Sequence, residues 1–213
     1  MKIALINENS QAAKNELIYS VLTKVASKYG HTVDNYGMYS QNDEAQLTYV
    51  QNGILTAILL NTSAADYVVT GCGTGVGAML ACNSFTGVLC GHISDPSDAY
   101  MFSQINDGNA VAIPFAKGFG WGAELNLEYM FVKLFSEKGG GGYPKDRVIP
   151  EQRNKKILDG VKKATHRDLL TVLGELDRDL LKGAVSGPNF AKLFYAGCKD
   201  NAVAEFIRKL TES

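Results

Sequence analysis

The segment Val69-Thr70-Gly71-Cys72-Gly73-Thr74-Gly75-Val76-Gly77-Ala78 decides the fold expected for this chain. An apolar run typical of a buried strand leads directly into four glycines that alternate with other residues, and a helix is expected to begin near Gly75. In open α/β sheets, ligands bind at the carboxyl ends of the strands. The segment therefore predicts a parallel sheet with a ligand site at Cys72.

The rest of residues 1 to 137 repeats the alternation of short strands and longer helices. Strands are expected at residues 2–6, 31–36, 67–70, 87–90 and 110–113. Apolar residues at helical spacing lie between the strands, and further helices are expected after Pro96 and near Gly118. Two of these stripes are Leu17, Ile18, Val21, Leu22 and Val25, and Leu47, Val50, Ile54 and Ile58. The pattern predicts an α/β, Rossmann-like three-layer fold with a five-stranded parallel sheet.

Four consecutive glycines at residues 139–142 end this pattern, and Pro144 follows them. Beyond the run the chain has only helical periodicity, which predicts a C-terminal helical extension. We therefore expect a Rossmann-like α/β domain at 1–138, a glycine-rich loop at 139–150 and the helical extension at 151–213. The apolar stripes of the extension need a partner surface, either in the same chain or in a neighbouring subunit. They comprise Leu169, Val172, Leu173, Leu176 and Leu180, and Val203, Phe206, Ile207 and Leu210.

Composition excludes several classes of protein. The chain has 213 residues, of which 46% are hydrophobic, and a net charge of -1. No apolar run approaches the roughly 20 residues that span a bilayer, and no basic block of a nucleic-acid binder is present. The first six residues fit a strand rather than a signal peptide, so we expect a cytoplasmic protein that binds a small molecule.

The cysteines and histidines do not have the spacing of a metal site. The four cysteines form no CxxC pair, and the three histidines lie far apart in the sequence. We therefore expect no metal and a reducing compartment. Cys82 and Cys90 lie in apolar segments and are expected to be core residues.

Cys72 differs from the other cysteines because glycines surround it. Glycines let backbone N–H groups approach a ligand, and the N-terminus of a helix adds about half a positive charge. This environment should favour the thiolate and stabilise a nearby oxyanion. A base beside such donors is what enolisation requires. Thr74 either donates its hydroxyl to a reacting oxygen or caps the following helix.

A nucleotide-binding module without chemistry is the alternative from another class. Gly73 to Ala78 satisfy a relaxed dinucleotide-binding fingerprint, and Asp95 follows at about the expected distance. That fingerprint normally opens the first strand–helix–strand unit, whereas here it lies in the third. Asp95 followed by Pro96 is more typical of a helix start.

The loop Cys72–Gly77 after the third strand and Asn106-Asp107-Gly108-Asn109 before the fifth together resemble the ribose-5-phosphate isomerase B and galactose-6-phosphate isomerase family. The resemblance covers about residues 1 to 150. It implies an enzyme without a cofactor, and a homodimer with active sites at the subunit interface. It also implies that Cys72 is the base, that Asn106 contacts a substrate oxygen, and that the backbone donors are Gly73, Gly75, Val76 and Gly77. Asn106 would otherwise be a turn residue.

The departures from this family concern substrate recognition. Ile105 replaces a histidine that the family uses for ring opening, and Glu8-Asn9 replaces Asp-His after the first strand. Tyr143 replaces one of two family arginines, while Arg147 matches the other. Glu8 either orders a substrate hydroxyl or caps the helix after Ser10.

One retained arginine suits a carboxylate better than a phosphate dianion, and the missing histidine suits an open-chain substrate. With the helical extension, these features resemble the family branch that isomerises 4-deoxy-L-threo-5-hexosulose uronate, a sugar acid from unsaturated uronates of glycosaminoglycan degradation. The expected activity is that of a ketol-isomerase, which acts through a cis-enediolate and gives 3-deoxy-D-glycero-2,5-hexodiulosonate. The first alternative is a sugar-phosphate isomerase of the ribose 5-phosphate or galactose 6-phosphate type.

Overall fold

The sheet has five parallel strands in the order β2-β1-β3-β5-β4 in the computed structural model, which describes residues 1–212. The strands are β1 (Lys2–Ile6), β2 (Thr32–Asn35), β3 (Tyr67–Cys72), β4 (Cys90–His92) and β5 (Ala110–Pro114). Val68 pairs with Ala110, and Cys72 pairs with Pro114, so β3 and β5 end at the same edge. The predicted five-stranded parallel sheet is confirmed.

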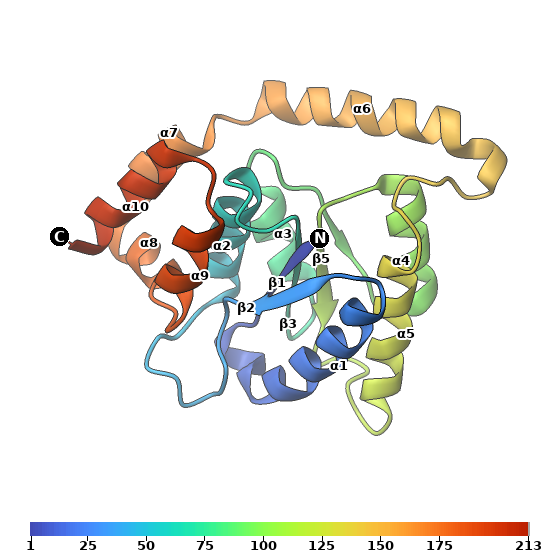
Figure 1. Cartoon of the computed structure of the whole chain (residues 1–213), viewed down its shortest axis with the longest axis horizontal. Helices are drawn as coiled ribbons and strands as arrows, with labels where there is room; N and C mark the ends of the chain where they lie inside the picture. The colour runs from blue at the N-terminus through green and yellow to red at the C-terminus, as the bar shows by residue number, and fades with distance from the viewer. Residues whose placement is uncertain (213) are drawn as a thin grey trace.

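Helices cover both faces of the sheet, which gives three layers (Figure 1). Side chains alternate along each strand, so Ile3 and Leu5 pack on one face while Ala4 and Ile6 pack on the other. The first face is covered by α1 (Asn15–Lys28), α4 (Pro96–Met101) and α5 (Ala123–Phe135), and the second by α2 (Tyr49–Asn61) and α3 (Val76–Asn83). Short turns of other helix types are η1 (Asn9–Lys14), η2 (Phe102–Asn106) and η3 (Lys145–Arg147).

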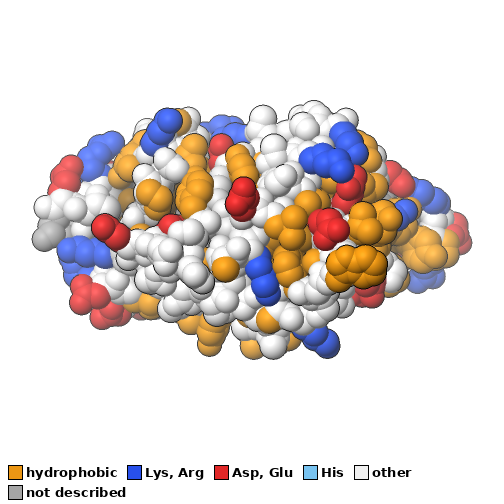
Figure 2. Space-filling view, turned by 90° about the horizontal axis from the view of Figure 1, so that it is seen from below, with side chains coloured by type: hydrophobic (Ala, Val, Ile, Leu, Met, Phe, Trp, Pro, Cys, Tyr) orange, Lys and Arg blue, Asp and Glu red, His pale blue; other side chains and the backbone are white. Residues whose placement is uncertain are grey.

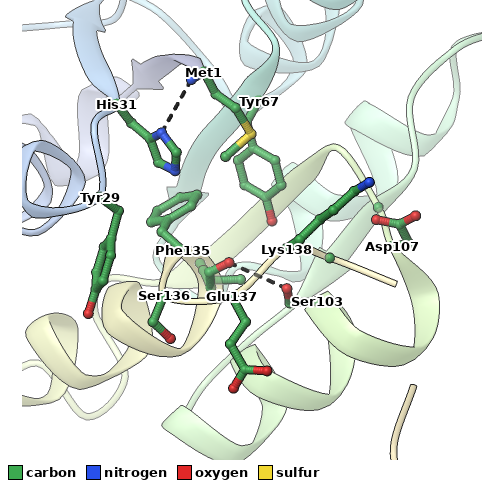
Figure 3. Close-up of a pocket in the computed structure, with 13 residues that line it drawn as sticks. Met1, Tyr29, His31, Tyr67, Ser103, Asp107, Phe135, Ser136, Glu137 and Lys138 are labelled. Carbon is green, nitrogen blue, oxygen red and sulfur yellow. Dashed lines mark hydrogen bonds between the residues drawn. The ribbon is translucent and has the colours of Figure 1, made fainter. Parts of the chain in front are cut away.

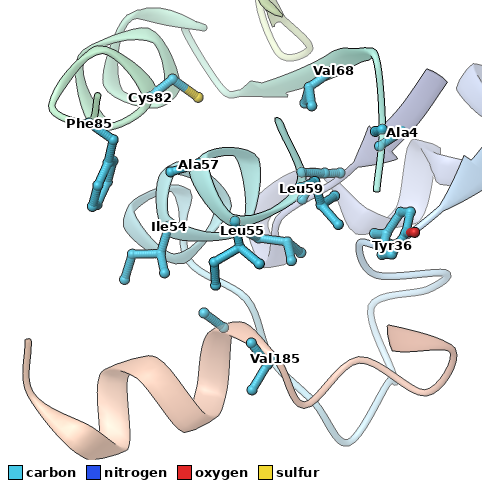
Figure 4. Packing of buried hydrophobic residues seen from close by; sticks show 14 of the residues in the cluster. Ala4, Tyr36, Ile54, Leu55, Ala57, Leu59, Val68, Cys82, Phe85 and Val185 are labelled. Carbon is cyan, nitrogen blue, oxygen red and sulfur yellow. The ribbon is translucent and has the colours of Figure 1, made fainter. Parts of the chain in front are cut away.

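The C-terminal helices form a further layer outside α2. They are α7 (Leu169–Glu175), α8 (Arg178–Ala184), α9 (Phe190–Gly197) and α10 (Asn201–Glu212). Leu173, Leu181 and Ile207 are buried in the same core cluster as Ile54 and Leu55 of α2. Figure 4 shows α2 between the sheet and the segment that carries Val185. The surface that the predicted apolar stripes need is therefore in the same chain.

The helix α6 (Val148–Thr165) connects this layer to the α4 and α5 side of the molecule. It runs along the top of Figure 1, away from the sheet, and none of its residues is buried. The glycine run before it folds against η2, because Gly140 N donates to Ser103 O at 2.9 Å and Gly142 N donates to Gln104 O at 3.0 Å. None of the helices within residues 1–212 combines the length and apolarity that crossing a membrane requires.

Two predicted boundaries were wrong. The fourth strand begins at Cys90 rather than at residue 87, because Gly87 has a φ of 71° and Leu89 N is bound by the side chain of Asn109. The helix expected near Gly118 begins at Ala123, because Gly118 and Gly122 both have positive φ angles. Left-handed backbone of this kind interrupts a strand or a helix.

Candidate functional site

A cleft of about 510 Å³ opens at the carboxyl edge of the sheet, between the ends of β1 and β3 and the start of α2. Six of the residues predicted for the site line it together, namely Glu8, Asn9, Cys72, Gly73, Thr74 and Gly77. The lining contains no lysine, arginine or histidine among the described residues. One chain therefore provides a thiol, a carboxylate and backbone amides in one place, without a positively charged side chain.

Cys72 is the last residue of β3, and its side chain is 7% exposed. The backbone on both sides of it is fixed to the chain after β5. Phe115 N donates to Cys72 O at 2.9 Å, and Ala116 N donates to Gly73 O at 3.0 Å. Gly71 has no room for a side chain, because the backbone oxygen of Ile113 and the ring of Phe115 fill that space. The thiol is thus held on a rigid strand end at the wall of the cleft.

The loop after Cys72 turns into α3 at Gly75, which has a φ of 75°. A Cβ atom on Gly75 would lie 2.8 Å from the ring of His92, a residue at the end of β4. His92 Nε2 lies 2.9 Å from Thr74 O and must carry the proton of this hydrogen bond, because a carbonyl oxygen only accepts. His92 therefore supports the glycine loop from behind.

No side chain caps the N-terminus of α3, so Thr74 does not have the capping role that was the alternative for it. Its side chain is exposed at the cleft instead. The first-turn N–H groups of a helix have no intrahelical partners and carry partial positive charge. Among these residues, Gly77 lines the cleft, Gly75 is buried, and Val76 is 44% exposed without lining the cleft. The arrangement can hold an anionic oxygen close to the Cys72 thiol.

Glu8 is 3% exposed and caps η1, since its carboxylate accepts from Ser10 N at 2.9 Å and from Ser10 Oγ at 2.6 Å. The predicted capping role of Glu8 is confirmed, although the helical turn begins at Asn9 rather than after Ser10. Gln11 Nε2 donates to the same Ser10 hydroxyl, and Lys14 Nζ donates to Gln11 Oε1 at 2.7 Å and to Phe115 O. Burial lowers the pKa of Lys14. Hydrogen bonds thus connect the carboxylate to a lysine that does not line the cleft.

Ser10, Thr48 and Tyr49 also line the cleft, and sequence analysis did not predict them as site residues. Thr48 begins α2 in a capping box with Gln51, which is a pattern that the sequence itself carries. Tyr49 is 46% exposed, and its ring lies 3.2 Å from the position of a Cβ on Gly77. The ring covers the first turn of α3.

Asn106, Tyr143 and Arg147 do not lie in this cleft. Asn106 precedes the amino end of β5, whereas Cys72 lies at the carboxyl end of its neighbour β3. The four residue steps from Val68 to Cys72 separate these edges by about 13 Å. Tyr143 packs edge-on against Tyr100 at 5.7 Å, and the exposed side chain of Arg147 makes no ion pair or hydrogen bond with the described residues. The predicted site residues thus form two groups at opposite edges of one chain.

A second cavity, of about 530 Å³, lies at the amino edge of the sheet (Figure 3). Its wall is aromatic, with Phe135 in edge-to-face contact with Tyr67 at 5.4 Å and with His31 at 6.0 Å. Burial raises the pKa of Tyr67 and lowers that of His31. No cysteine of the described residues lines this cavity, whereas Cys72 and the glycine loop line the cleft at the opposite edge.

Asp95 caps α4, as the sequence predicted, by accepting from Ser97 N at 2.8 Å and Asp98 N at 2.9 Å. The Ser97 hydroxyl and these amides hold the pKa of Asp95 below its usual range. Asp95 is therefore engaged as a cap rather than available to a ribose. Within residues 1–212, no three His, Cys, Asp or Glu side chains converge in a way that could hold a metal ion.

Comparisons with known proteins agree with this fold. A family model described as Ribose/Galactose Isomerase matches residues 3–148, and one described as Ribose-5-phosphate isomerase matches residues 164–210. Among curated proteins, none matches the chain.

Two solved structures are similar over nearly the whole chain. A 4-deoxy-L-threo-5-hexosulose-uronate ketol-isomerase, complexed with a tartrate, is 60% identical over 100% of both chains, with a TM-score of 0.98. A ribose-5-phosphate isomerase from Vibrio parahaemolyticus is 49% identical over 99% of both chains, with a TM-score of 0.96. A type B ribose 5-phosphate isomerase from Trypanosoma cruzi is 14% identical, with a TM-score of 0.63 over 77% of this chain and 99% of its own, and shares the fold alone.

Proposed function

This chain belongs to the Ribose/Galactose Isomerase family, and we propose that it converts 4-deoxy-L-threo-5-hexosulose uronate to 3-deoxy-D-glycero-2,5-hexodiulosonate in the cytoplasm, as a step of unsaturated uronate degradation. The observation that carries the proposal is the position of Cys72, whose thiol shares a cleft with the amides at the start of α3. The choice of substrate is supported by the 60% identical relative, a ketol-isomerase of that uronate.

The proposed reaction moves one proton between adjacent carbons. The Cys72 thiolate takes the proton from C2 of the open-chain aldehyde, and the electron pair of that C–H bond forms the C1–C2 double bond of a cis-enediolate. The amides of the loop and the Thr74 hydroxyl stabilise the charge on the two oxygens. The Cys72 thiol then returns the proton to C1, and the hydroxyl proton moves from O2 to O1. No electrons leave the substrate, so the step balances without a redox partner.

The substrate's functional groups suit the residues on both edges of the sheet. This uronate has no C4 hydroxyl and has a ketone at C5, so it does not close an ordinary sugar ring. An open-chain substrate needs no ring-opening histidine, and Ile105 at that position therefore does not prevent turnover. Glu8 and Asn9 both line the cleft, and we assign them to the substrate hydroxyl groups, with Glu8 acting from its position as the cap of η1. The exposed guanidinium of Arg147 has no ion pair within residues 1–212, and it can form two parallel hydrogen bonds with the substrate carboxylate.

A homodimer would unite the two groups of residues. In a two-fold dimer the same two patches meet twice, so the partner subunit's Asn106, Tyr143 and Arg147 can complete the cleft around Cys72. Apolar side chains reach the surface at several places on the lower side of the molecule (Figure 2). Those exposed beside the cleft include Tyr49, Val76 and Leu80, and α6 exposes Ile149, Ile157, Leu158 and Val161. Burying such residues would stabilise the dimer.

Competition between substrate classes tests the proposed function. The unmodified protein should isomerise the uronate with a much higher kcat/KM than ribose 5-phosphate or galactose 6-phosphate. Arg147→Ala should lower kcat/KM for the uronate by the equivalent of about 2–5 kcal/mol, as when one partner of a desolvated charge pair is removed. A higher kcat/KM for ribose 5-phosphate than for the uronate would reject the proposed substrate.

A sugar-phosphate isomerase is the second candidate, because the 49% identical relative is a ribose-5-phosphate isomerase. The double variant Ile105→His and Tyr143→Arg separates the two candidates. If the unmodified chain is a uronate enzyme, the double variant should gain activity on phosphorylated sugars, though only in part because Glu8 and Asn9 still differ from the family. If the chain already acts on sugar phosphates, the substitutions should bring no gain.

A further inference from the structure

A closed set of hydrogen bonds lies in the core beneath the cleft, outside the proposed mechanism. Asn52 Nδ2 donates to Ile6 O at 3.1 Å and to Thr70 Oγ1 at 3.0 Å, and the Thr70 hydroxyl donates to Ile6 O at 2.8 Å. Asn52 and Thr70 are both 0% exposed. The three residues belong to α2, β3 and β1, so this group, here called the Asn52 cluster, joins the three elements between which the cleft opens.

Two members of the Asn52 cluster lead directly to functional groups of the cleft. Ile6 ends β1 and precedes Glu8 by two residues, while Thr70 precedes Cys72 by two residues in β3. Side chains two residues apart on a strand point to the same face, so Thr70 and Cys72 both face α2. Ile6 and Thr70 are also the last paired residues of β1 and β3, so their hydrogen bond lies where the pairing ends and the cleft begins.

The third member holds the start of α2 at the same point. Asn52 lies in the first turn of α2, and its backbone N–H donates to Thr48 O at 3.0 Å. Thr48 and Tyr49 line the cleft, and the Tyr49 ring covers the first turn of α3 at Gly77. A shift of α2 on the sheet would therefore move one wall of the cleft relative to the strand end that carries the thiol.

The amide of Asn52 is a poor choice for stability alone. Its Oδ1 is buried and has no hydrogen-bond partner within residues 1–212. Its neighbours Ile54 and Leu55 on the same helix are buried apolar residues (Figure 4). An unpaired buried oxygen destabilises a protein, and a leucine at this position would have no such atom. Residues that break a local rule of stability in this way are expected at functional sites.

We propose that Asn52 and Thr70 are positioning residues for the isomerisation, which hold the Cys72 thiol at a fixed place relative to Glu8 and the loop amides. This inference rests on the proposed function, in which Cys72 is the base. Proton transfer depends steeply on geometry, and a displacement of about 1 Å can cost about 100-fold in rate. Loss of the Asn52 cluster should therefore slow the chemical step while the groups that bind the substrate remain.

Thr70→Val tests this role, because it removes the hydroxyl and keeps the shape of the side chain. It should lower kcat about tenfold while KM changes by less than about twofold, since only the reacting thiol is displaced. Thr70→Ser restores a hydroxyl and should keep kcat within about twofold of that of the unmodified protein. Asn52→Leu breaks the connection from the side of α2 and should lower kcat in the same way. The double variant should be about as slow as the slower single variant, because both substitutions act on one network.

Thr62→Val is the matched control at the opposite end of α2. Thr62 is 1% exposed, and its hydroxyl donates to Ile58 O at 2.7 Å, so this variant also loses a buried hydrogen bond to a carbonyl oxygen. Both valine variants should lower the urea midpoint of unfolding, but only Thr70→Val should lower kcat. Circular dichroism at the assay temperature checks that each variant is folded.

The assay uses whichever of 4-deoxy-L-threo-5-hexosulose uronate, ribose 5-phosphate and galactose 6-phosphate the unmodified protein isomerises with the highest kcat/KM. A sugar phosphate in that place would reject the proposed substrate, whereas the comparison of variants would still decide the role of the Asn52 cluster. The inference is overturned if folded Thr70→Val keeps its kcat, or if Thr62→Val loses as much kcat as Thr70→Val. If Thr70→Val does not fold, Asn52→Leu compared with Thr62→Val decides by the same criteria.

Discussion

Glycine loops are usually explained by backbone freedom alone, but at Gly75 the neighbouring side chain matters as much. Gly75 has a φ of 75° and also faces the His92 ring, whereas Gly118 has a φ of 70° with no atom within 4 Å of its missing Cβ. The strained φ costs an alanine about 1–3 kcal/mol at either position, and crowding adds about 1–3 kcal/mol only at Gly75. Comparing Gly75 with Gly118 therefore separates the cost of the φ angle from the cost of crowding.

We therefore predict that Gly75→Ala lowers the free energy of unfolding by at least about 1 kcal/mol more than Gly118→Ala does. The measurement is urea denaturation of both variants beside the unmodified protein. Gly75→Ala should also lower kcat, because the amides and Cys72 share the displaced loop. Equal losses of stability in the two variants would show that His92 does not confine Gly75.

Cys72 should be required for turnover but not for folding. We predict that Cys72→Ala lowers kcat by at least about 100-fold to 10,000-fold, as removal of a general base does. Cys198→Ala, which alters a half-buried thiol outside the cleft, should retain activity. Steady-state kinetics on the uronate together with circular dichroism checks both statements, and a near-normal rate in Cys72→Ala would remove this thiol from the mechanism.

At the scale of elements, the sequence was sufficient to predict a helix, strand or loop wherever its periodicity and its local signals agree. The strand at Lys2–Ile6, the start of α4 at Pro96 and the glycine loop after β3 were predicted because their signals lie within a few residues. The start of β4 was not, because it depends on the Asn109 side chain, 20 residues away. Tyr49 was missed for a similar reason, since only the packing of α2 against α3 brings it over Gly77.

The cap of α4 gives a prediction at this scale. Asp95→Ala should lower the free energy of unfolding at pH 7 by about 0.5–2 kcal/mol, and Asp95→Asn by less, because asparagine also caps helices. The pKa of Asp95 is lowered in the folded state, so the contribution of its charge is present above the unfolded pKa of about 3.9 and lost as the pH falls through the folded pKa. Urea denaturation between pH 7 and pH 3 should therefore show the stability difference between the unmodified protein and Asp95→Asn narrowing in acid. A difference that stays constant over this range would show that the Asp95 charge does not stabilise the cap.

At the scale of the whole molecule, the separation of Cys72 from Arg147 is the main result for function. Sequence analysis predicted both residues but could not place them at opposite edges, because the register of β3 and β5 is a property of the folded sheet. The division of the chain at residues 138 and 150 stays a prediction. The glycine run between these positions folds against η2 through two backbone hydrogen bonds.

Mixing two inactive variants tests whether subunits share each site. Cys72→Ala and Arg147→Ala should each be impaired alone, and refolding them together should restore about one quarter of the wild-type activity, since half of the dimers carry one intact cleft. Arg153→Ala, on the exposed side of α6, is the control and should be active alone. If heterodimers form without any recovery of activity, the two groups of residues do not complete one another.

The most direct test of the central claim is isomerisation of 4-deoxy-L-threo-5-hexosulose uronate in deuterated water, with the product examined by NMR. If Cys72 moves the proton through an enediolate, and the thiol exchanges its proton with the solvent before returning it, the product should carry solvent deuterium on the hydroxymethyl carbon that was C1 of the substrate and is C6 of the product. Cys72→Ala should form almost no product. Turnover that leaves this hydroxymethyl carbon free of solvent deuterium, or labelled product formed at the wild-type rate by Cys72→Ala, would contradict the account.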